Sequence, residues 1–327
     1  MFHRLYLIIS ILVLCTFSMA QSSQENIKNS YAQRAKLASS SILKNYPVRN
    51  VGPVVQGGRV SDIAVNPTNS KEYYVAYASG GVFKTVNNGI TFYPVFEDQD
   101  VLGIGDIALA PSDPNIIYVG TGEKNSSRSS YAGFGVYKST DGGVTWSTIG
   151  LSGVQHTSRV IVHPTNPNTV WVASLGALYS KDENRGVYKS DDGGKTWAKT
   201  LYLNDSTGIV DLVINPDNPD QLWAASWERT RKAWNFKGNG EGSAIYRSDD
   251  GGKTWEKKIV GFPQNGFVGR IGLDISISES NVIYALLDNQ EVTKEEKKQE
   301  EGLKIADFLT MTKEAFLALD NKKLNEL

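Results

Sequence analysis

Cysteine, histidine and net charge are all scarce in this sequence of 327 residues. The single cysteine is Cys15, inside an apolar stretch near the N-terminus, so we expect a mature chain without a disulfide or a cysteine-bound metal. His156 and His163 follow that stretch, and no zinc-ligand spacing surrounds them. The 34 basic residues nearly cancel the 35 acidic ones, and no basic run carries interleaved aromatic residues. The composition argues against nucleic-acid binding and predicts no metal or other cofactor.

Long apolar runs are also missing, apart from one at the N-terminus. Arg4 is followed by the apolar residues 5–17, and the small residues Ser18 and Ala20 come next. This order is typical of a secretory signal peptide over residues 1–20. A membrane anchor is the alternative, but about a dozen apolar residues are too few to cross about 30 Å of hydrocarbon. We therefore expect an exported protein (periplasmic, cell-surface or extracellular) that keeps no stable membrane span once the signal is removed.

A ten-residue pattern, Tyr-(Lys/Arg)-Ser-x-Asp-Gly-Gly-x-Thr-Trp, recurs along the rest of the chain. Intact copies occupy residues 137–146, 188–197 and 246–255, and an eroded copy occupies residues 83–92. Successive copies start 54, 51 and 58 residues apart. A period of this length indicates a repeat protein, with propellers and solenoids as the leading candidates.

One repeat, residues 103–151, shows how the unit is built. Ile104–Ala110, Ile116–Thr121, Gly135–Ser139 and Val144–Ile149 are rich in β-forming residues, and turn sequences separate them. We call these predicted strands A, B, C and D. Four strands in each repeat favour a propeller, because solenoid repeats use one or two. The predicted fold class is therefore all-β, a propeller of four-stranded antiparallel blades.

The blades are predicted to lie within residues 46–290, after a polar leader at residues 21–45. Four blades are followed by the A and B strands of a fifth, at residues 271–277 and 282–287. A propeller left incomplete in this way has unpaired strand edges, which closed propellers avoid. We therefore expect the sequence to be the beginning of a longer polypeptide with further domains. Tyr46–Val51 is a candidate strand for completing the last blade.

Residues 291–327 depart from the repeat pattern. A mixed-charge run at Glu291–Glu301 is typical of a linker or a solvated helix, and apolar residues at helical spacing over residues 305–327 predict an amphipathic helix, with Thr312 as a cap. This helix is either a terminal helix that docks on the propeller or part of an insertion in blade five. We favour the insertion.

The repeated pattern has a structural role in its own turn. Its aspartate can accept hydrogen bonds from nearby backbone amides, its glycines supply positive φ, and its tryptophan can pack between neighbouring sheets. We therefore assign these residues to structure and not to catalysis. They are Ser139, Asp141, Gly143 and Trp146, then Ser190, Asp192, Gly194 and Trp197, then Ser248, Asp250, Gly252 and Trp255.

The pattern resembles the Asp-box repeat of bacterial neuraminidases. The segment Gly57-Gly58-Arg59-Val60-x-Asp62 is similar to the opening of the sortilin-type propellers of large exported bacterial proteins, many of which are labelled glycosyl hydrolases. The resemblance covers residues 46–290 and implies a propeller fold. It leaves the activity open, because Asp-box repeats occur in sialidases, xyloglucanases, sortilin-like receptors and assembly factors.

The blades of a propeller form a disc, and the antiparallel strand order assigns the turns to its two rims. The A–B and C–D turns, with the Asp-boxes, share one rim, and the long B–C segments 122–134, 176–185 and 228–243 share the other. We predict that this B–C rim is the functional face, because loops carry recognition. Trp234 either contacts a ligand or packs on a sheet. The candidate ligand-binding residues are Arg59, Arg159, Arg270, Trp234, Arg229, Arg231 and Tyr131.

The innermost strands carry charged residues at equivalent positions. Counted back from the A–B turn, Asp62, Asp106, Arg159 and Asp211 occupy the same place in successive blades. This mixed-charge ring is either the wet wall of a channel or a saccharide or peptide site. Because glycosidases need two carboxyl groups, the three aspartates are the catalytic candidates. No Arg-Ile-Pro segment occurs, so we do not expect a sialidase.

The leading hypothesis is an exported propeller with a glycan- or peptide-binding face on the B–C rim. The alternative is a glycoside hydrolase that uses the carboxylates of the channel. A second alternative is a scaffold for assembling envelope proteins.

Overall fold

The computed structural model describes residues 24–46, 58–263, 265–292 and 305–320. The chain divides into two compact units, residues 1–290 and 291–327, which we describe separately. The predicted signal peptide, the candidate strand Tyr46–Val51 beyond its first residue, and most of the predicted linker lie outside the described residues.

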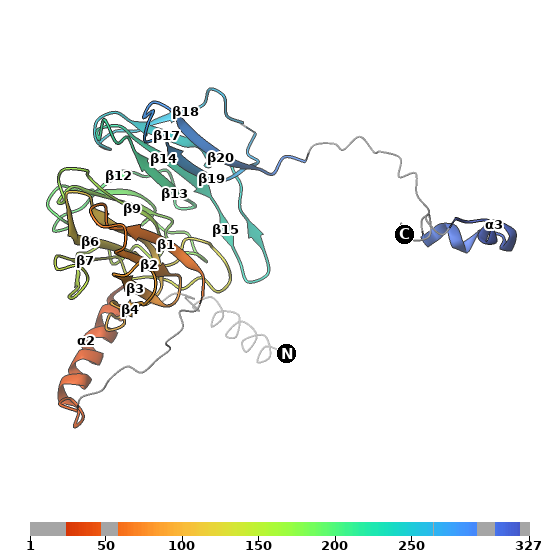
Figure 1. The fold of residues 1–327 in the computed structure, drawn as a ribbon. Coiled ribbons are helices and arrows are strands. Elements are labelled where there is room, and N and C mark those ends of the chain that lie inside the picture. Colours follow the sequence, from red (N-terminus) through yellow and green to blue (C-terminus); the bar gives the residue numbers. More distant parts are fainter. Residues whose placement is uncertain (1–23, 47–57, 264, 293–304, 321–327) are drawn as a thin grey trace, which may run out of the picture. The chain divides into compact units, whose positions relative to one another are not determined.

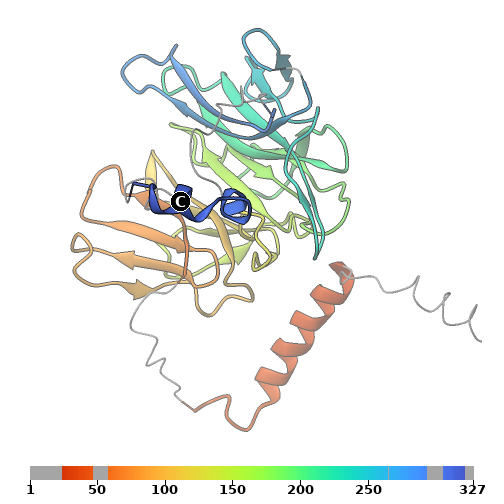
Figure 2. The same cartoon turned by 90° about the vertical axis from the view of Figure 1, so that its right-hand side faces the viewer.

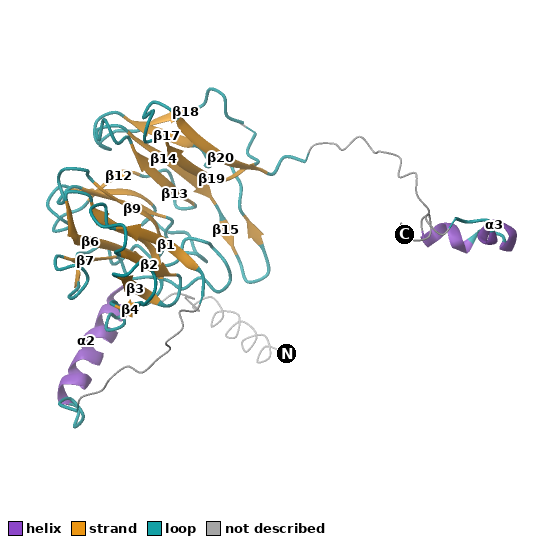
Figure 3. Ribbon diagram, in the orientation of Figure 1, coloured by secondary structure: helices purple, strands orange, loops and turns teal. Residues whose placement is uncertain are grey.

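The first unit consists of antiparallel sheets whose strands follow one another in chain order, as Figures 1 and 3 show. The four complete blades and the two-stranded start of a fifth agree with the prediction and confirm the all-β blade architecture. The blades are β1 (Val60–Val65), β2 (Tyr73–Tyr77), β3 (Gly81–Thr85) and β4 (Tyr93–Pro94); β5 (Ile104–Ala110), β6 (Asp113–Thr121), β7 (Val136–Ser139) and β8 (Ser147–Thr148); β9 (Thr157–Val162), β10 (Val170–Ser174), β11 (Gly186–Ser190) and β12 (Ala198–Leu201); β13 (Thr207–Ile214), β14 (Leu222–Glu228), β17 (Ile245–Ser248) and β18 (Glu256–Lys258); and β19 (Val268–Ile275) with β20 (Ile283–Asn289).

The first strand of each blade contacts the first strand of the next. β1 contacts β5, β5 contacts β9, β9 contacts β13, and β13 contacts β19. The sheets therefore stand side by side, as Figure 2 shows, and the contacts between successive A strands place these strands on the inner side. Residues of the A strands thus face one shared inner surface.

The outermost strands are shorter than the sequence predicts. β8 covers only Ser147–Thr148, whereas the sequence predicts a strand over Val144–Ile149. The difference arises because the Asp-box turn extends up to its tryptophan, and its residues hydrogen-bond within the turn. The sequence also gave no sign of β15 (Thr230–Arg231) and β16 (Phe236–Lys237), a hairpin inserted between the B and C strands of the fourth blade.

The Asp-box turns have the hydrogen bonds that the sequence predicts. In the second blade the amide of Thr145 donates to Oδ1 of Asp141 (2.9 Å), and the Thr145 hydroxyl donates to Oδ2 (2.6 Å). The Ser139 hydroxyl accepts from the amide of Gly143 (2.9 Å), whose φ of 87° favours glycine. The hydrogen bonds, first of all those from Thr145, lower the pKa of Asp141 to about 2. The other two intact boxes repeat these bonds.

The box tryptophans join neighbouring blades, also as predicted. Nε1 of Trp146 donates to the carbonyl of Val95 (2.7 Å), and Nε1 of Trp197 donates to that of Ile149 (2.7 Å). Each acceptor belongs to the preceding blade. The buried apolar clusters lie likewise between adjacent sheets.

The remaining described elements are helical. The leader, for which no secondary structure was predicted, forms the helix α2 (Gln24–Ser40). Tyr31 on this helix lies edge-on to Phe134, and the centroids of the two rings are 5.1 Å apart. In the second unit the described part of the predicted helix is a 3-10 turn, η1 (Ile305–Leu309), followed by the short helix α3 (Lys313–Leu317). Thr312 caps α3 as predicted, accepting from the amide of Ala315. None of the described helices is long and apolar enough to cross a membrane.

Candidate functional site

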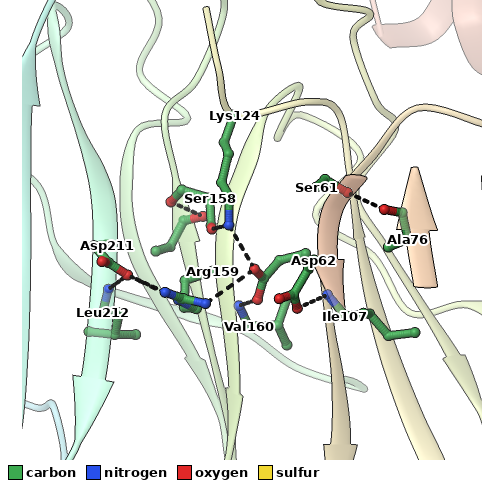
Figure 4. Close-up of polar contacts among 12 residues, drawn as sticks. Ser61, Asp62, Ala76, Ile107, Lys124, Ser158, Arg159, Val160, Asp211 and Leu212 are labelled. Carbon is green, nitrogen blue, oxygen red and sulfur yellow. Dashed lines mark hydrogen bonds and ion pairs between the residues drawn. The ribbon is translucent and has the colours of Figure 1, made fainter. Parts of the chain in front are cut away.

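The charged positions of the inner strands connect one blade to the next. Oδ2 of Asp62 accepts from the amide of Ile107 (3.2 Å), and Oδ2 of Asp106 accepts from the amide of Val160 (2.8 Å). Oδ2 of Asp211 accepts from the amide of Leu273 (2.9 Å). In each case the donor lies on the A strand of the next blade, and Figure 4 shows two of these donors, Ile107 and Val160. The three carboxylates therefore hold adjacent A strands together.

A β-bulge precedes each of these aspartates. The register shifts between Val60 and Asp62, between Ile104 and Asp106, and between Ile209 and Asp211. A bulge inserts one extra residue and re-aims the side chain that follows it. This local irregularity directs the carboxylates toward the neighbouring blade.

Arg159 is the exception in the ring, because a guanidinium cannot accept a hydrogen bond. It lies between two carboxylates, with Nη1 at 3.6 Å from Oδ1 of Asp106 and Nη2 at 2.8 Å from Oδ1 of Asp211. By the pattern of the other blades, an aspartate at position 159 would accept from the amide of Leu212. That amide instead donates to Oδ1 of Asp211 (2.9 Å). Arg159 thus replaces one strand-to-strand link with a pair of ion pairs.

Asp106 is the most buried member of this network, with 1% of its surface exposed. Its Oδ1 also accepts from Nζ of Lys124 at 3.1 Å, a contact drawn in Figure 4. Burial raises the pKa of Asp106 to about 6, although Lys124 and Arg159 oppose the shift. All polar contacts of this carboxylate are thus made within the protein. Lys124 was not a predicted site residue, because it lies in a B–C loop whose path the sequence does not fix.

A groove of about 290 Å³ runs along the inner strands beside this network. Asp62, Asp106 and Arg159 line it, together with the turn residues Pro67 and Pro111. The prolines belong to the A–B turns, so the groove extends toward the Asp-box rim and not toward the B–C rim. Among the described residues, no cluster of acidic, histidine or cysteine side chains could hold a metal ion.

Arg59 is paired with Glu123, a residue that sequence reasoning missed. Its Nε and Nη2 donate to the two oxygens of the Glu123 carboxylate, both at 2.7 Å. Burial acts to raise the pKa of Glu123, but hydrogen bonds from Arg59 and Asn125 outweigh it and the pKa lies below its ordinary value. The pair links the B–C loop of the second blade to the residue just before β1.

Hydrogen bonds join parts of the B–C rim to one another. The hydroxyl of Tyr179 donates to the carbonyl of Arg128 (3.2 Å), and Nη1 of Arg270 donates to Oδ1 of Asn125 (3.4 Å). Loops of the second and third blades therefore touch, and the start of β19 reaches the loop of the second blade. Arg270 also lies near the ring of Trp227, at 5.7 Å from its centroid.

Two of the predicted binding residues are aromatic side chains that project from this rim. Trp234, on the β15–β16 hairpin, is 82% exposed, and Tyr131, on the loop of the second blade, is 61% exposed. Trp234 therefore does not pack on a sheet. Arg231 of the same hairpin lies over the ring of Phe236 at 4.9 Å, and Arg229 is buried beneath.

Comparison with known proteins connects this architecture to a family. The family model described as "Sortilin, neurotensin receptor 3" matches residues 134–325. The chain belongs to the Sortilin-Vps10 family. The Sortilin-Vps10 match begins in the second blade and continues through the second unit, and it agrees with the sortilin-type resemblance read from the Asp-boxes.

Curated relatives of this Sortilin-Vps10 chain have two kinds of name. It is 24% identical over 227 residues to the probable oligoxyloglucan-reducing end-specific xyloglucanase of Neosartorya fischeri, covering 64% of this chain and 25% of the relative. It is 25% identical over 252 residues to a xyloglucanase of a Paenibacillus species, covering 69% and 23%. It is 28% identical over 193 residues to the photosystem II assembly lipoprotein Ycf48 of Prochlorococcus marinus, covering 52% and 56%. The chain thus spans about a quarter of the length of the two xyloglucanases.

A solved structure supports the fold. The crystal structure of an ancestral GH74 enzyme superposes with a TM-score of 0.54 at 22% sequence identity, covering 72% of this chain and 30% of that one. At this level of identity the likeness extends to the propeller architecture of the Sortilin-Vps10 chain alone.

Proposed function

We propose that this protein is an exported propeller that binds a glycan on its B–C rim. The observation that carries the proposal is the exposure of Trp234 and Tyr131 on that rim, 82% and 61%, beside loops that hydrogen-bond to one another. Large exposed aromatic rings among polar loops mark binding surfaces, since water solvates them poorly. The relatives named xyloglucanases favour a glycan over a peptide as the ligand.

The inner carboxylates support binding without turnover. Asp106 is buried, forms ion pairs with Lys124 and Arg159, and accepts a hydrogen bond from a backbone amide. Asp211 forms an ion pair with Arg159 and accepts from the amide of Leu273. A glycosidase needs one carboxyl group that donates a proton to the leaving oxygen and a second that reaches the sugar or a water. Carboxylates whose oxygens already bind neighbouring strands and side chains are poorly suited to both tasks.

Trp234→Ala tests the binding face. The full chain would be screened on a glycan array, and the affinity for the best neutral or acidic oligosaccharide would be measured by titration calorimetry. We expect Trp234→Ala to weaken that affinity about tenfold or more, as truncation of a central aromatic contact does. Tyr93→Ala, which removes an exposed ring from β4, should leave it unchanged. Equal affinities for the wild type and Trp234→Ala would refute a glycan site at this hairpin.

Hydrolysis is the second candidate, and one observation favours it. Asp62 and Asp106 line the same groove, and Asp106 has the raised pKa of a general acid, about 6. If the groove is catalytic, xyloglucan incubated with the protein should release reducing ends.

Asp62→Asn separates hydrolysis from binding. Asparagine keeps an oxygen that can accept from the amide of Ile107, so the strand link survives while the carboxylate is lost. Under the hydrolase hypothesis this change should lower the release of reducing ends by about a hundredfold or more. Asp98→Asn, an exposed change on the first blade, is the control. No release by the wild-type protein would exclude xyloglucan hydrolysis, and co-purifying envelope proteins without glycan affinity would favour the assembly alternative.

A further inference from the structure

Arg229 is a buried guanidinium that is largely without partners. It lies just after β14, at the base of the β15–β16 hairpin, and only 3% of its surface is exposed. Its Nη2 donates to the carbonyl of Leu175 at 3.3 Å, but its Nε and Nη1 have no hydrogen-bond partner among the described residues. Leaving buried donors unpaired is costly, and more so when they carry a charge.

Three other arginines of this unit have partners for their guanidinium groups. Arg185 donates to the carbonyls of Asp205 (2.7 Å), Ala177 (3.0 Å), Leu175 and Ser180. Arg59 and Arg159 are paired with carboxylates. Arg229 therefore differs from these three arginines, and its neighbour Arg231 also has a buried, unpaired Nε.

The charges around Arg229 add to the deficit. Burial, and after it the nearby guanidinium groups of Arg185, Arg231 and Arg270, lower the pKa of Arg229 to about 9. No carboxylate acts in the opposite sense, and that of the adjacent Glu228 accepts from the amide of Gly242 (2.9 Å). Three guanidinium groups thus act on Arg229, whereas the carboxylates nearby act on Arg185 and Arg270.

The cluster connects the interior with the rim. Arg231 and Arg270 are partly exposed, and Arg229 and Arg270 both lie near the ring of Trp227, at 5.8 and 5.7 Å. The hairpin above is joined by only two residue pairs, Thr230 with Lys237 and Arg231 with Phe236. This hairpin also carries the exposed Trp234.

We propose that Arg229, Arg231 and Arg270 form a subsite for the oxyanion of an acidic glycan, a carboxylate or a sulfate ester on a sugar ring. The forked donors of a guanidinium match both groups, and the bound anion would satisfy the free donors of Arg229 and Arg231. Trp234 would contact the same or the adjoining sugar. This inference rests on the proposed glycan-binding face and specifies the ligand class.

The test compares three oligosaccharides with the full chain at constant ionic strength: an oligogalacturonate, an O-sulfated glucan oligosaccharide and a neutral xyloglucan oligosaccharide. We expect at least one acidic ligand to bind about tenfold to a hundredfold more tightly than the neutral one. Arg229→Gln and the more peripheral Arg231→Gln should each remove most of that advantage. Arg128→Gln, an exposed change of the same charge on the loop of the second blade, should not.

The outcomes separate the subsite from the binding face. If the neutral and acidic ligands bind equally and Arg229→Gln changes neither affinity, the oxyanion subsite is wrong and the glycan face stands. If no oligosaccharide binds, both are wrong. If acidic ligands bind better but Arg128→Gln weakens them as much as Arg231→Gln, the preference is a diffuse charge effect and the subsite is wrong. The ligand that binds best decides between carboxylate and sulfate. Thermal unfolding of each variant shows whether a lost affinity reflects a lost fold.

Discussion

At the scale of single residues, the equivalent position on the inner strands holds an aspartate in three blades and an arginine in one. Asp62, Asp106 and Asp211 each bind the amide of the next blade, whereas Arg159, at the same position, bridges two of these carboxylates. A substitution from acceptor to donor therefore did not break the ring. The arginine is accommodated because Asp211 accepts hydrogen bonds from the amides of both Leu212 and Leu273.

Asp106 should make the stability of the protein depend on pH. Burial raises its pKa from the ordinary 3.8 to about 6, so the folded state binds this proton more tightly than the unfolded chain. The free energy of unfolding therefore falls as pH rises through the window from about 4 to 6. We expect Asp106→Asn, which has no proton to lose, to gain about 3 kcal/mol relative to the wild type across that window. The sign follows from the raised pKa and holds whatever constant cost the lost ion pairs add.

Denaturant unfolding at pH 4 and pH 6.5 would check this prediction. Asp98→Asn, on the surface of the first blade, corrects for the general effect of removing a carboxylate. A constant difference between Asp106→Asn and the wild type at both pH values would mean that Asp106 titrates normally in the folded protein.

At the scale of elements, the repeats allowed most of the fold to be predicted. The A strand over Ile104–Ala110 has the bounds that the sequence predicts, because an apolar run with one polar interruption ends at a Pro-Ser turn. The Asp-box turns were also predictable, since their hydrogen bonds join residues two to four apart. Even the eroded first copy keeps them: Asn87 accepts from the amide of Thr91, and Thr85 from that of Gly89.

The sequence did not predict contacts between distant residues or elements whose hydrophobic pattern is weak. α2 has few apolar residues at helical spacing, so nothing distinguished it from a polar leader. The site shows the same limit. The ring of Asp62, Asp106, Arg159 and Asp211 followed from counting back to the turn, but the pairing of Glu123 with Arg59 joins residues 64 apart. The unpaired donors of Arg229 are a property of the folded state and have no signature in the sequence.

At the scale of the whole molecule, stability comes from the interfaces between blades. Each of the four buried apolar clusters is shared by two adjacent sheets, and the tryptophans of the Asp-boxes hydrogen-bond to the preceding blade. In such an arrangement each blade contacts chiefly its neighbours, so stability is approximately a sum of blade and interface contributions. A defect at one interface should then be felt first by the two blades that share it.

Trp197→Ala tests this view of the molecule. Trp197 packs in the cluster between the second and third blades, and its Nε1 donates to the carbonyl of Ile149. Its truncation should lower the free energy of unfolding by about 3 kcal/mol, through lost packing and an unpaired carbonyl. Trp234→Ala is the matched control, because that ring is exposed on the hairpin, and it should change stability by no more than about 0.5 kcal/mol. Hydrogen exchange should rise first in β5–β12 of Trp197→Ala, while β13 and β14 stay protected. Equal destabilisation by both changes, or a uniform rise in exchange over all the sheets, would show that the blades do not depend on their interfaces in this way.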